Sequence, residues 1–317
     1  MATSFSLSTL VNTNIPKNFY PDHAYDLHPT LMTFIGKAKT QDGGRSYDPN
    51  RIATKDATST WFAGTTLSAV ISSASQTGAL LNETYPWTSV ITPITLTYEE
   101  RLKASGDSEE IRIKMQDAKK AQAKLDHMDA LGAKLYAGDG TSNTPRGFLY
   151  LIQPTGAYGS ADPSADADWA GQATTSATVM TGPSTLTDAY IPCMHNNREP
   201  DLMPTGATLY AKISNIFGMG IQTQNKDDQK YKFGIKGLEF MNAKIYLDRD
   251  ISSGDIPFLC SDVIELRKSS KFWMKYKEPV EPTDGTNIHL SQVGYMLSSF
   301  ILAATERRCH GGYTSLT

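Results

Sequence analysis

The longest regular pattern of apolar and polar positions in this 317-residue chain lies between residues 107 and 137. Apolar side chains recur there every three or four residues, the spacing of one face of an α-helix. Asp107 or Ser108 can cap the first turn, and Gly138 is expected to end the helix in the left-handed conformation. About thirty residues at a rise of 1.5 Å predict a rod of about 45 Å. The apolar stripe consists of Ile111, Met115, Ala118, Ala121, Leu125, Met128, Leu131 and Leu135.

Shorter patterns on both sides of this helix predict an α+β protein. Residues 23–38 and 184–197 are expected to form helices, with Met194 among the inward-facing residues of the second. The segment 88–100 is rich in β-branched residues, which predicts a strand. Further along the chain we predict a strand at 147–153, a helix at 205–220, a strand at 236–248, one or two strands at 256–279, and a returning segment at 288–312.

Two stretches near the N-terminus do not fit a globular core. Residues 1–22 are polar and irregular, and we expect them to form an arm. Residues 39–92 are rich in Ser, Thr, Ala and Gly, and hold too few apolar side chains to offset the entropy lost on folding. They predict a long loop or hairpin that needs the surface of a partner.

Composition and charge exclude several classes of protein. Apolar residues make up 39% and charged residues 20% of the chain, which is typical of a folded protein. A net charge of -3 gives no basic excess for wrapping nucleic acid. No apolar run reaches the length of a membrane span, and the first residues lack the features of a signal peptide. The three cysteines, Cys193, Cys260 and Cys309, show no CxxC spacing and indicate buried thiols in a reducing compartment.

The loop YAGDGTSNTPRGF, residues 136–148, has the composition of a phosphate or metal site. A phosphate-binding loop follows a strand and opens a helix, whereas this one is predicted to follow a helix and open a strand near Phe148. A calcium loop starting at Asp139 would need acidic residues at alternate positions and a Glu at the twelfth, where Thr141 and Tyr150 stand. We therefore predict a turn without a ligand, with left-handed geometry explaining its glycines.

Other clusters of polar residues also lack the spacing of a known site. Asp162, Asp166 and Asp168 fit no EF-hand, and we expect a solvated loop. The chain has no HExxH or GxSxG motif, so each histidine is interpreted as a packing or surface residue. We therefore predict no catalytic, cofactor-binding or metal-binding residue, and no enzyme. The six histidines are His23, His28, His127, His195, His289 and His310.

One basic and aromatic cluster, KSSKFWMKYKEP, spans residues 268–279. In a strand, Lys271, Trp273, Lys275 and Lys277 would share one face, with Phe272, Met274 and Tyr276 on the other. Proteins that bind single-stranded nucleic acid use such interleaving. Because the whole chain is slightly acidic, we favour a strand with one buried face, whose lysines discourage edge pairing.

An arm, an unsupported loop, a long helix and an α+β body together indicate an assembly protein. The chain resembles the major capsid proteins of tailed phages, whose shell fold is named after phage Hong Kong 97. The order and spacing of the segments carry this resemblance, rather than any single motif, and they include the turn of the 136–148 loop with its Gly147–Phe148 pair. The similar segments are 18–49, 59–67, 82–100, 135–152, 186–213, 237–275 and 294–316.

The resemblance implies a division of the chain into five parts. These are an N-terminal arm and short helix at 1–38, an extended loop at 39–92, a peripheral domain at 93–155 with a spine helix at 107–137, a central domain at 156–260, and long C-terminal strands at 261–317. It also implies hexamers and pentamers that form an icosahedral shell around double-stranded DNA, in a virion assembled in the host cytoplasm. The implied partners are further copies of the chain, a scaffolding protein, a portal and a decoration protein, with no membrane.

Some relatives differ in ways that bear on this chain. Certain relatives carry a cleaved helical scaffold domain before the arm, for which the residues before the long helix leave no room, so we expect a separate scaffolding protein. Others join subunits through a Lys–Asn isopeptide bond, and no motif here pairs Lys55 with Asn287. Two alternatives stay open: an encapsulin-like nanocompartment shell, and a soluble enzyme with an unrecognised site.

Overall fold

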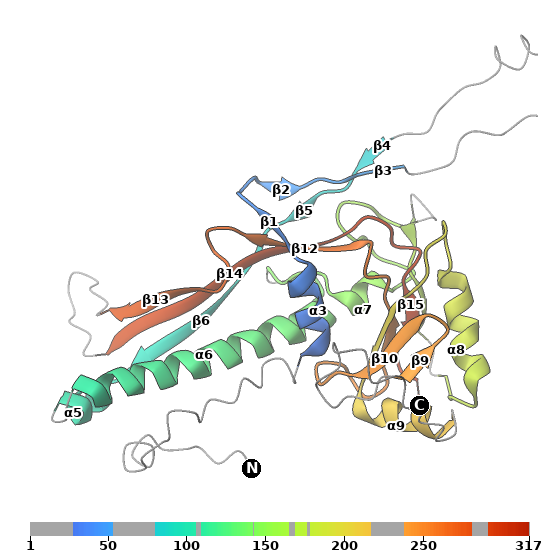
Figure 1. The fold of residues 1–317 in the computed structure, drawn as a ribbon. Helices are drawn as coiled ribbons and strands as arrows, with labels where there is room; N and C mark the ends of the chain where they lie inside the picture. Colours follow the sequence, from blue (N-terminus) through green and yellow to red (C-terminus); the bar gives the residue numbers. More distant parts are fainter. Residues whose placement is uncertain are drawn as a thin grey trace, which may run out of the picture.

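The structure is a computed structural model with three visible parts. A long sheet runs above helix α6 at one end, two small sheets with helices α8 and α9 form a rounded part at the other, and a thin β-ribbon leaves the body (Figure 1). This mixture confirms the predicted α+β class. The described residues are 28–52, 80–105, 109–141, 143–164, 169–175, 178–216, 238–280 and 291–316.

Strand β14 (Gln292–Ala304) is the central strand of the long sheet. Its first part pairs antiparallel with β6 (Thr88–Leu96) and with β13 (Lys275–Val280). Its last part pairs antiparallel with β12 (Ile264–Ser269), and β1 (Lys39–Gln41) adds to β12 in parallel. The returning segment predicted at 288–312 therefore contains, as β14, the strand around which this sheet is built.

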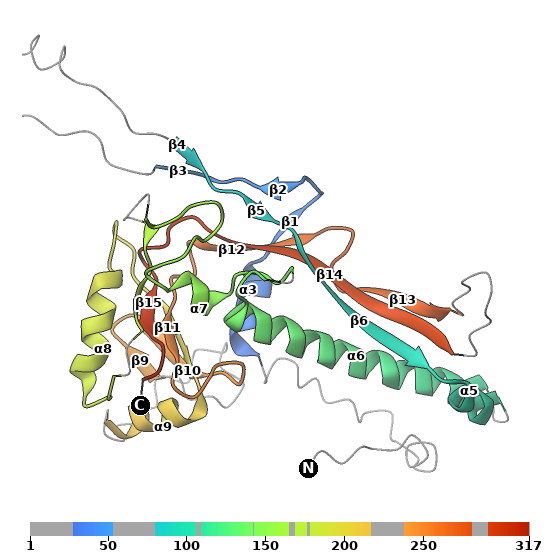
Figure 2. The ribbon, with the colours of Figure 1, turned by 180° about the vertical axis from the view of Figure 1, so that it is seen from behind.

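Helix α6 (Glu109–Ala137) lies along one face of the long sheet (Figure 2). Its bounds agree closely with the predicted 107–137, although the proposed caps at 107–108 lie outside the described residues. Leu125, which belongs to the predicted apolar stripe, is more than one-third exposed. The buried face is displaced toward one side of that stripe and includes a histidine. Its buried residues are Ala123, His127, Met128, Leu131, Leu135 and Tyr136.

The strand predicted at 88–100 ends earlier, at Leu96, and a helix that we did not predict follows it, α5 (Tyr98–Ser105). Thr97 and Glu100 form a capping box at this junction. The Glu100 carboxylate accepts from the Thr97 backbone N–H at 3.0 Å, and the Thr97 hydroxyl accepts from the Glu100 N–H at 3.4 Å. The sequence Thr-Tyr-Glu-Glu carried this signal for a helix start.

The rounded part contains two three-stranded sheets. One has the order β8 (Leu202–Thr205), β10 (Ala243–Leu247), β9 (Leu238–Phe240). The strand predicted at 236–248 is thus a hairpin, because the chain reverses at Met241, whose φ is +53°. The other sheet has the order β11 (Ile256–Phe258), β15 (Gly311–Tyr313), β7 (Gln172–Thr174).

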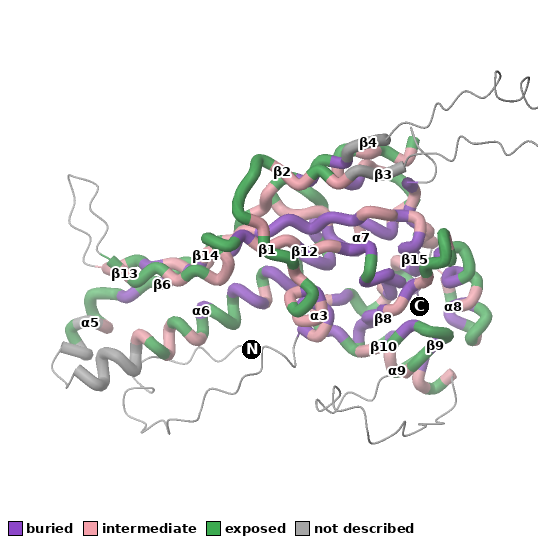
Figure 3. Tube along the Cα trace, turned by 45° about the horizontal axis from the view of Figure 1, so that its top comes forward, coloured by how far each residue is buried: buried purple, intermediate pink, exposed green. Residues whose placement is uncertain are grey.

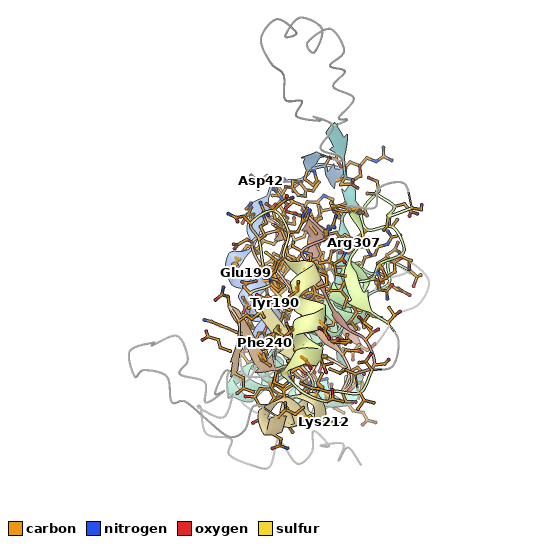
Figure 4. The ribbon with its side chains drawn as sticks, turned by 90° about the vertical axis from the view of Figure 1, so that its right-hand side faces the viewer. Asp42, Tyr190, Glu199, Lys212, Phe240 and Arg307 are labelled. Carbon is orange, nitrogen blue, oxygen red and sulfur yellow. The ribbon has the colours of Figure 1, made fainter. Side chains whose placement is uncertain are left out.

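Two helices cover these sheets. They are α8 (Pro183–Tyr190), continued by the 3₁₀ turn η3 (Ile191–Cys193), and α9 (Ala207–Ile216). The Tyr190 ring lies in the core between them, with its centroid 5.9 Å from that of Phe240 (Figure 4). The helix predicted at 184–197 is confirmed up to Cys193, and that predicted at 205–220 is confirmed from Ala207 to Ile216, because Thr205 belongs to β8 and 217–220 are not described. Met194, however, is 52% exposed, because the chain leaves the helix after Cys193.

Residues 147–153 do not form the predicted strand. They begin with the short helix α7 (Phe148–Leu151), whose Leu151 N–H donates to the Gly147 carbonyl at 2.9 Å. A short apolar run has no periodicity that separates a strand from one turn of helix. Burial of Phe148 and Leu151 decides in favour of the helix.

The chain passes between the long sheet and the β11–β15–β7 sheet at two adjacent crossings. One crossing, 259–263, leads from β11 to β12, and the other, 305–310, leads from β14 to β15. The Thr305 N–H donates to the Val263 carbonyl at 2.9 Å, so the two crossings lie side by side. Buried residues are concentrated around this junction, whereas β13 carries only half-buried and exposed ones (Figure 3).

The helix predicted at 23–38 is α3 (Pro29–Lys37), which buries Leu31 and Phe34 against the body. The segment predicted as a long loop or hairpin, 39–92, begins and ends in strands of the long sheet, β1 and β6, and forms a hairpin between them; 53–79 lies outside the described residues, as does the proposed arm at 1–22. Among the helices of the described ranges, none combines the length and the apolar character needed to span a bilayer. The hairpin pairs β2 (Ser46–Tyr47) with β5 (Tyr85–Pro86) and β3 (Asn50–Ile52) with β4 (Leu80–Asn82).

Candidate assembly surfaces

A cluster of charged side chains around Glu265 fixes the base of the projecting hairpin. The Glu265 carboxylate on β12 accepts from Lys39 Nζ on β1 at 2.6 Å and from Arg267 Nη2 at 2.9 Å. Burial acts to raise the pKa of Glu265, but these hydrogen bonds outweigh it and hold the pKa below its usual value. The Arg267 guanidinium also lies 3.5 Å from the centre of the Tyr47 ring, a cation–π contact to β2.

The returning strand of the hairpin is anchored as well. The buried Tyr85 hydroxyl donates to the Ala304 carbonyl at the end of β14 over 2.7 Å. Trp87 Nε1 donates to the Gly44 carbonyl over 2.8 Å and ties the two sides of the hairpin together. Beyond this base, β3 and β4 extend away from the body (Figures 1 and 2). The hairpin therefore leaves the body in a defined direction without a core of its own.

The long sheet has one covered and one open face. On the covered face, Met296 and Phe300 of β14 are buried, and His127 of α6 bonds to Ser298. On the open face, Ile91 of β6 is 59% exposed, and its neighbour across the ladder is Leu297. The open face is apolar in the middle and basic at one edge. Its residues are Ser89, Ile91, Pro93, Thr95, Val293, Tyr295, Leu297, Ser299, Lys275 and Lys277.

The 136–148 loop is a compact turn that opens a helix. The Asp139 carboxylate accepts from the Thr141 N–H at 2.9 Å and the Thr141 hydroxyl at 2.7 Å, and the hydroxyl bond is the main cause that lowers the pKa of Asp139. The Gly147 N–H donates to the Gly138 carbonyl at 2.7 Å and closes the loop. The expected strand near Phe148 was wrong, since α7 begins there.

Glycine is required at positions of this loop for two different reasons. Gly140 has a φ of +80°, the left-handed geometry that we had assigned to Gly138. Gly138 is required by close approach instead, because a Cβ atom there would lie 2.1 Å from the Pro145 carbonyl oxygen. At Gly147 a Cβ would lie 2.5 Å from the Tyr136 carbonyl oxygen. Crowding by backbone oxygens gives no local signal in the sequence.

The histidines predicted to pack are held by specific partners. His127 is buried and bonds through Nδ1 to the Thr92 hydroxyl and through Nε2 to the Ser298 hydroxyl, each at 2.8 Å. Burial lowers its pKa. His195 is half-buried, 2.6 Å from a carboxylate oxygen of Glu306. His23 and His289 lie outside the described residues.

The remaining candidate clusters form no site in the described residues. Asp162 accepts from the Ser164 N–H at 2.8 Å in an exposed turn, whereas Asp166 and Asp168 are not described. Lys55 and Asn287 are not described either. Within the described ranges, no three His, Cys, Asp or Glu side chains converge as metal ligands.

The basic and aromatic cluster at 268–279 is not one strand. β12 ends at Ser269 and β13 begins at Lys275, with a turn in which Met274 has a φ of +50°. Trp273 packs edge-on against Phe300, with 6.4 Å between the ring centroids. The predicted stripe of alternating lysines and aromatics therefore does not exist as a continuous surface.

The chain is similar to known proteins in its fold but not in its sequence. No family model and no curated protein matches the chain. The capsid of cyanophage A-1(L) matches with a TM-score of 0.62 at 12% identity, over 96% of this chain and 96% of that one. The capsid of an empty GTA particle matches with a TM-score of 0.57 at 11% identity, over 98% and 97%. A structure of mycobacterium phage Cain matches with a TM-score of 0.57 at 13% identity, over 98% of both chains.

The chain has the shell fold of tailed-phage capsid proteins. The fold expected from the resemblance is therefore confirmed, with α6 as its spine helix and the β2–β5 hairpin as its extended loop. Nearly complete coverage of both chains means that the likeness includes the hairpin base, the long sheet and the rounded part alike. The boundaries given for the five parts stay predictions.

Proposed function

We propose that the chain is the major capsid protein of a tailed phage. Copies of it would assemble as hexamers and pentamers into an icosahedral shell around double-stranded DNA. The role is structural, with no catalytic residue and no cofactor. The observation that carries the proposal is that one chain combines a firmly anchored projecting hairpin with an open, partly apolar sheet face.

The projecting hairpin and the open sheet face are both energetically unfavourable in an isolated protomer. The hairpin has two paired strands beyond its base, and an isolated two-stranded ribbon is marginal in water. Side chains such as Ile91 and Val293 stay in contact with water unless another molecule covers them. Neighbouring copies in a shell would cover both surfaces, which accounts for them without a ligand or an active site.

The proposal extends to the location and partners of the protein. The shell would be part of a virion that is assembled in the host cytoplasm, with a scaffolding protein, a portal and a decoration protein as further partners. The slightly acidic chain favours enclosure of DNA over tight, sequence-specific binding.

The first experiment compares the wild-type chain with two variants at Ile91. Expressed alone, the wild-type chain should form large assemblies, closed or open, visible by sedimentation and electron microscopy. Ile91→Glu places a charge on the open face and should leave folded protomers, whereas Ile91→Val keeps the face apolar and should still assemble. A wild-type chain that stays monomeric at high concentration would contradict the proposal.

A second pair of variants tests the hairpin base. Glu265→Gln weakens the bonds to Lys39 and Arg267, and should reduce the yield of regular particles with little change in the melting temperature of the protomer. Glu278→Gln, an exposed residue on β13, is the control and should assemble normally.

The contents of the particles separate the capsid from its alternatives. Particles purified with a portal and packed with double-stranded DNA would favour the capsid, and particles filled with an enzyme would favour an encapsulin-like nanocompartment. A stable monomer that is stabilised by a small molecule would favour a soluble enzyme instead.

A further inference from the structure

Cys260 and Cys309 lie at the junction between the long sheet and the β11–β15–β7 sheet. Cys260 belongs to the crossing 259–263, and Cys309 to the crossing 305–310. Both are reduced and buried, and with Val263 they form a small cluster separate from the larger cores. The two side chains are packed in this one cluster, and His310 contacts both cysteines. Residues 49 positions apart in sequence thus bring two sulfur atoms together at the point where the chain crosses twice.

His310 fixes the polar surroundings of this pair. Its Nδ1 accepts from the Cys260 backbone N–H at 3.1 Å, and its Nε2 lies 3.8 Å from Cys309 Sγ. Complete burial lowers the pKa of His310 to about 3, so the ring is neutral. A neutral ring that accepts at Nδ1 carries its proton on Nε2, which directs an N–H toward Cys309.

The two thiols are not equivalent. Pairing with Cys309 lowers the pKa of Cys260, whereas the same pairing and burial raise the pKa of Cys309, whose S–H donates to the Glu306 carbonyl at 3.5 Å. Cys260 is therefore the first of the pair to reach the thiolate form, which is the form that reacts with oxidants. It also keeps slight exposure, whereas Cys309 has none.

We propose that Cys260 and Cys309 are a latent disulfide site, which a peroxide oxidises once the protein leaves a reducing compartment. The Cys260 thiolate attacks hydrogen peroxide, the O–O bond breaks, and a proton completes one water, which leaves a sulfenic acid. The Cys309 sulfur then attacks that sulfur, and the hydroxyl leaves with the Cys309 proton as a second water. Two thiols and one peroxide thus give one disulfide and two waters.

The bond would join the two crossings covalently. Without it, neighbouring backbone bonds such as Thr305 N–H to the Val263 carbonyl hold the crossings together. With it, β12, β13 and β14 lie inside a closed covalent loop, which restricts the unfolded chain. The site would make the junction between the long sheet and the rounded part more rigid outside the cell than inside it.

The test treats the reduced full-length protein with hydrogen peroxide and removes the excess. Free thiols, counted after denaturation, should fall from three to one, and the intact mass should fall by two hydrogens. Peptide mapping without reductant should find one cross-linked pair that contains Cys260 and Cys309. The melting temperature should rise by on the order of 5 °C and return with dithiothreitol.

Cysteine variants give the controls. Cys193 lies in the larger core cluster of the rounded part, so Cys193→Ser should still form the bond. Cys260→Ser and Cys309→Ser should each form no intrachain disulfide and show no thermal gain. Three thiols that survive peroxide in the folded protein, a bond to Cys193, or oxidation that stops at sulfinic acid would each overturn the proposal. The result does not depend on shell formation, because protomers and assemblies can be assayed separately.

Discussion

His28 and Asp250 lie 222 positions apart in sequence, yet His28 Nδ1 is 2.6 Å from a carboxylate oxygen of Asp250. His28 Nε2 is 2.7 Å from a carboxylate oxygen of Asp129 on α6. Ionised carboxylates only accept hydrogen bonds, so both ring nitrogens donate and His28 is an imidazolium cation. It ties the start of α3 to the spine helix and to the turn after β10. Arg249, also paired with Asp129 at 3.0 Å, completes the charges around it.

The first prediction concerns the pH dependence of this cluster. Burial acts to lower the pKa of His28, but the bonds and charges of Asp250 and Asp129 outweigh it, and the pKa is raised. The stabilisation is therefore complete below about pH 6.5 and is lost as the pH rises through the raised pKa. His28→Gln should lower the free energy of unfolding of the protomer by on the order of 2–4 kcal/mol at low pH, and by less at high pH.

Urea denaturation from about pH 5 to pH 9 measures this difference. His195→Gln is the control, since His195 is half-buried and bonds to one carboxylate, Glu306, rather than to two, and it should contribute less than His28. If the free energy of unfolding lost in His28→Gln does not change with pH, the His28 ring is neutral.

The second prediction is that the stabilisation by His127 has the opposite pH dependence. Burial lowers the pKa of His127, which bonds as a neutral ring to Thr92 and Ser298. Its stabilisation is present above about pH 6.5 and is lost as the pH falls through the lowered pKa. The difference between wild type and His127→Gln should therefore shrink toward acid in the same urea series. Parallel slopes for His28→Gln and His127→Gln would refute one of the two charge assignments.

The third prediction concerns the glycine that ends the spine helix. Gly138→Ala places a Cβ against the Pro145 carbonyl oxygen, and should destabilise the protomer by about 2 kcal/mol or more. Gly36→Ala in α3 is the matched control, because a Cβ there meets nothing within 4 Å. That change should be neutral or stabilising by up to about 1 kcal/mol. The measurement is the melting temperature of each variant. Equal melting temperatures would contradict the predicted clash at Gly138.

The fourth prediction concerns Arg307, a fully buried arginine (Figure 4). Its guanidinium donates to backbone carbonyls at the end of α7 and in the segment that follows, and holds both in place. The single ammonium group of Arg307→Lys cannot donate to all of these carbonyls, so this change should lower the free energy of unfolding by about 3 kcal/mol or more. Arg249→Lys at the surface should cost less than about 1 kcal/mol in the same urea experiment. The carbonyl partners of Arg307 are Leu151, Gly156, Tyr150, Gln153 and Thr155, at 2.8, 2.6, 2.9, 2.8 and 3.4 Å.

The fifth prediction concerns the 136–148 loop. One carboxylate oxygen of Asp139 accepts three hydrogen bonds from Thr141 and Thr144, and no further acidic side chain joins it, within the described residues, as a metal ligand, so we expect no bound cation. Removal of divalent ions with a chelator should leave the melting temperature of wild type unchanged. A melt that drops with chelator in wild type, but not in Asp139→Ala, would make the loop a metal site.

The sequence by itself determined the elements whose signal is local. The 3.6-residue period predicted the spine helix, and it also placed α3, α8 and α9, because each buries one stripe of its own residues. The scarcity of apolar side chains in 39–92 predicted a hairpin without its own core. Thr97 and Glu100 carried a readable start signal for α5 that we did not use.

Tertiary structure decided what depends on distant neighbours. Phe148 begins a helix rather than a strand because both Phe148 and Leu151 are buried. Gly138 is required by the Pro145 carbonyl, and His28 gains its charge from two carboxylates far away in sequence. Cys260 and Cys309 meet only because two paired strands cross between the sheets together. Local pattern reports which face of an element is apolar, whereas contacts between elements exist only after the chain has closed its long loops.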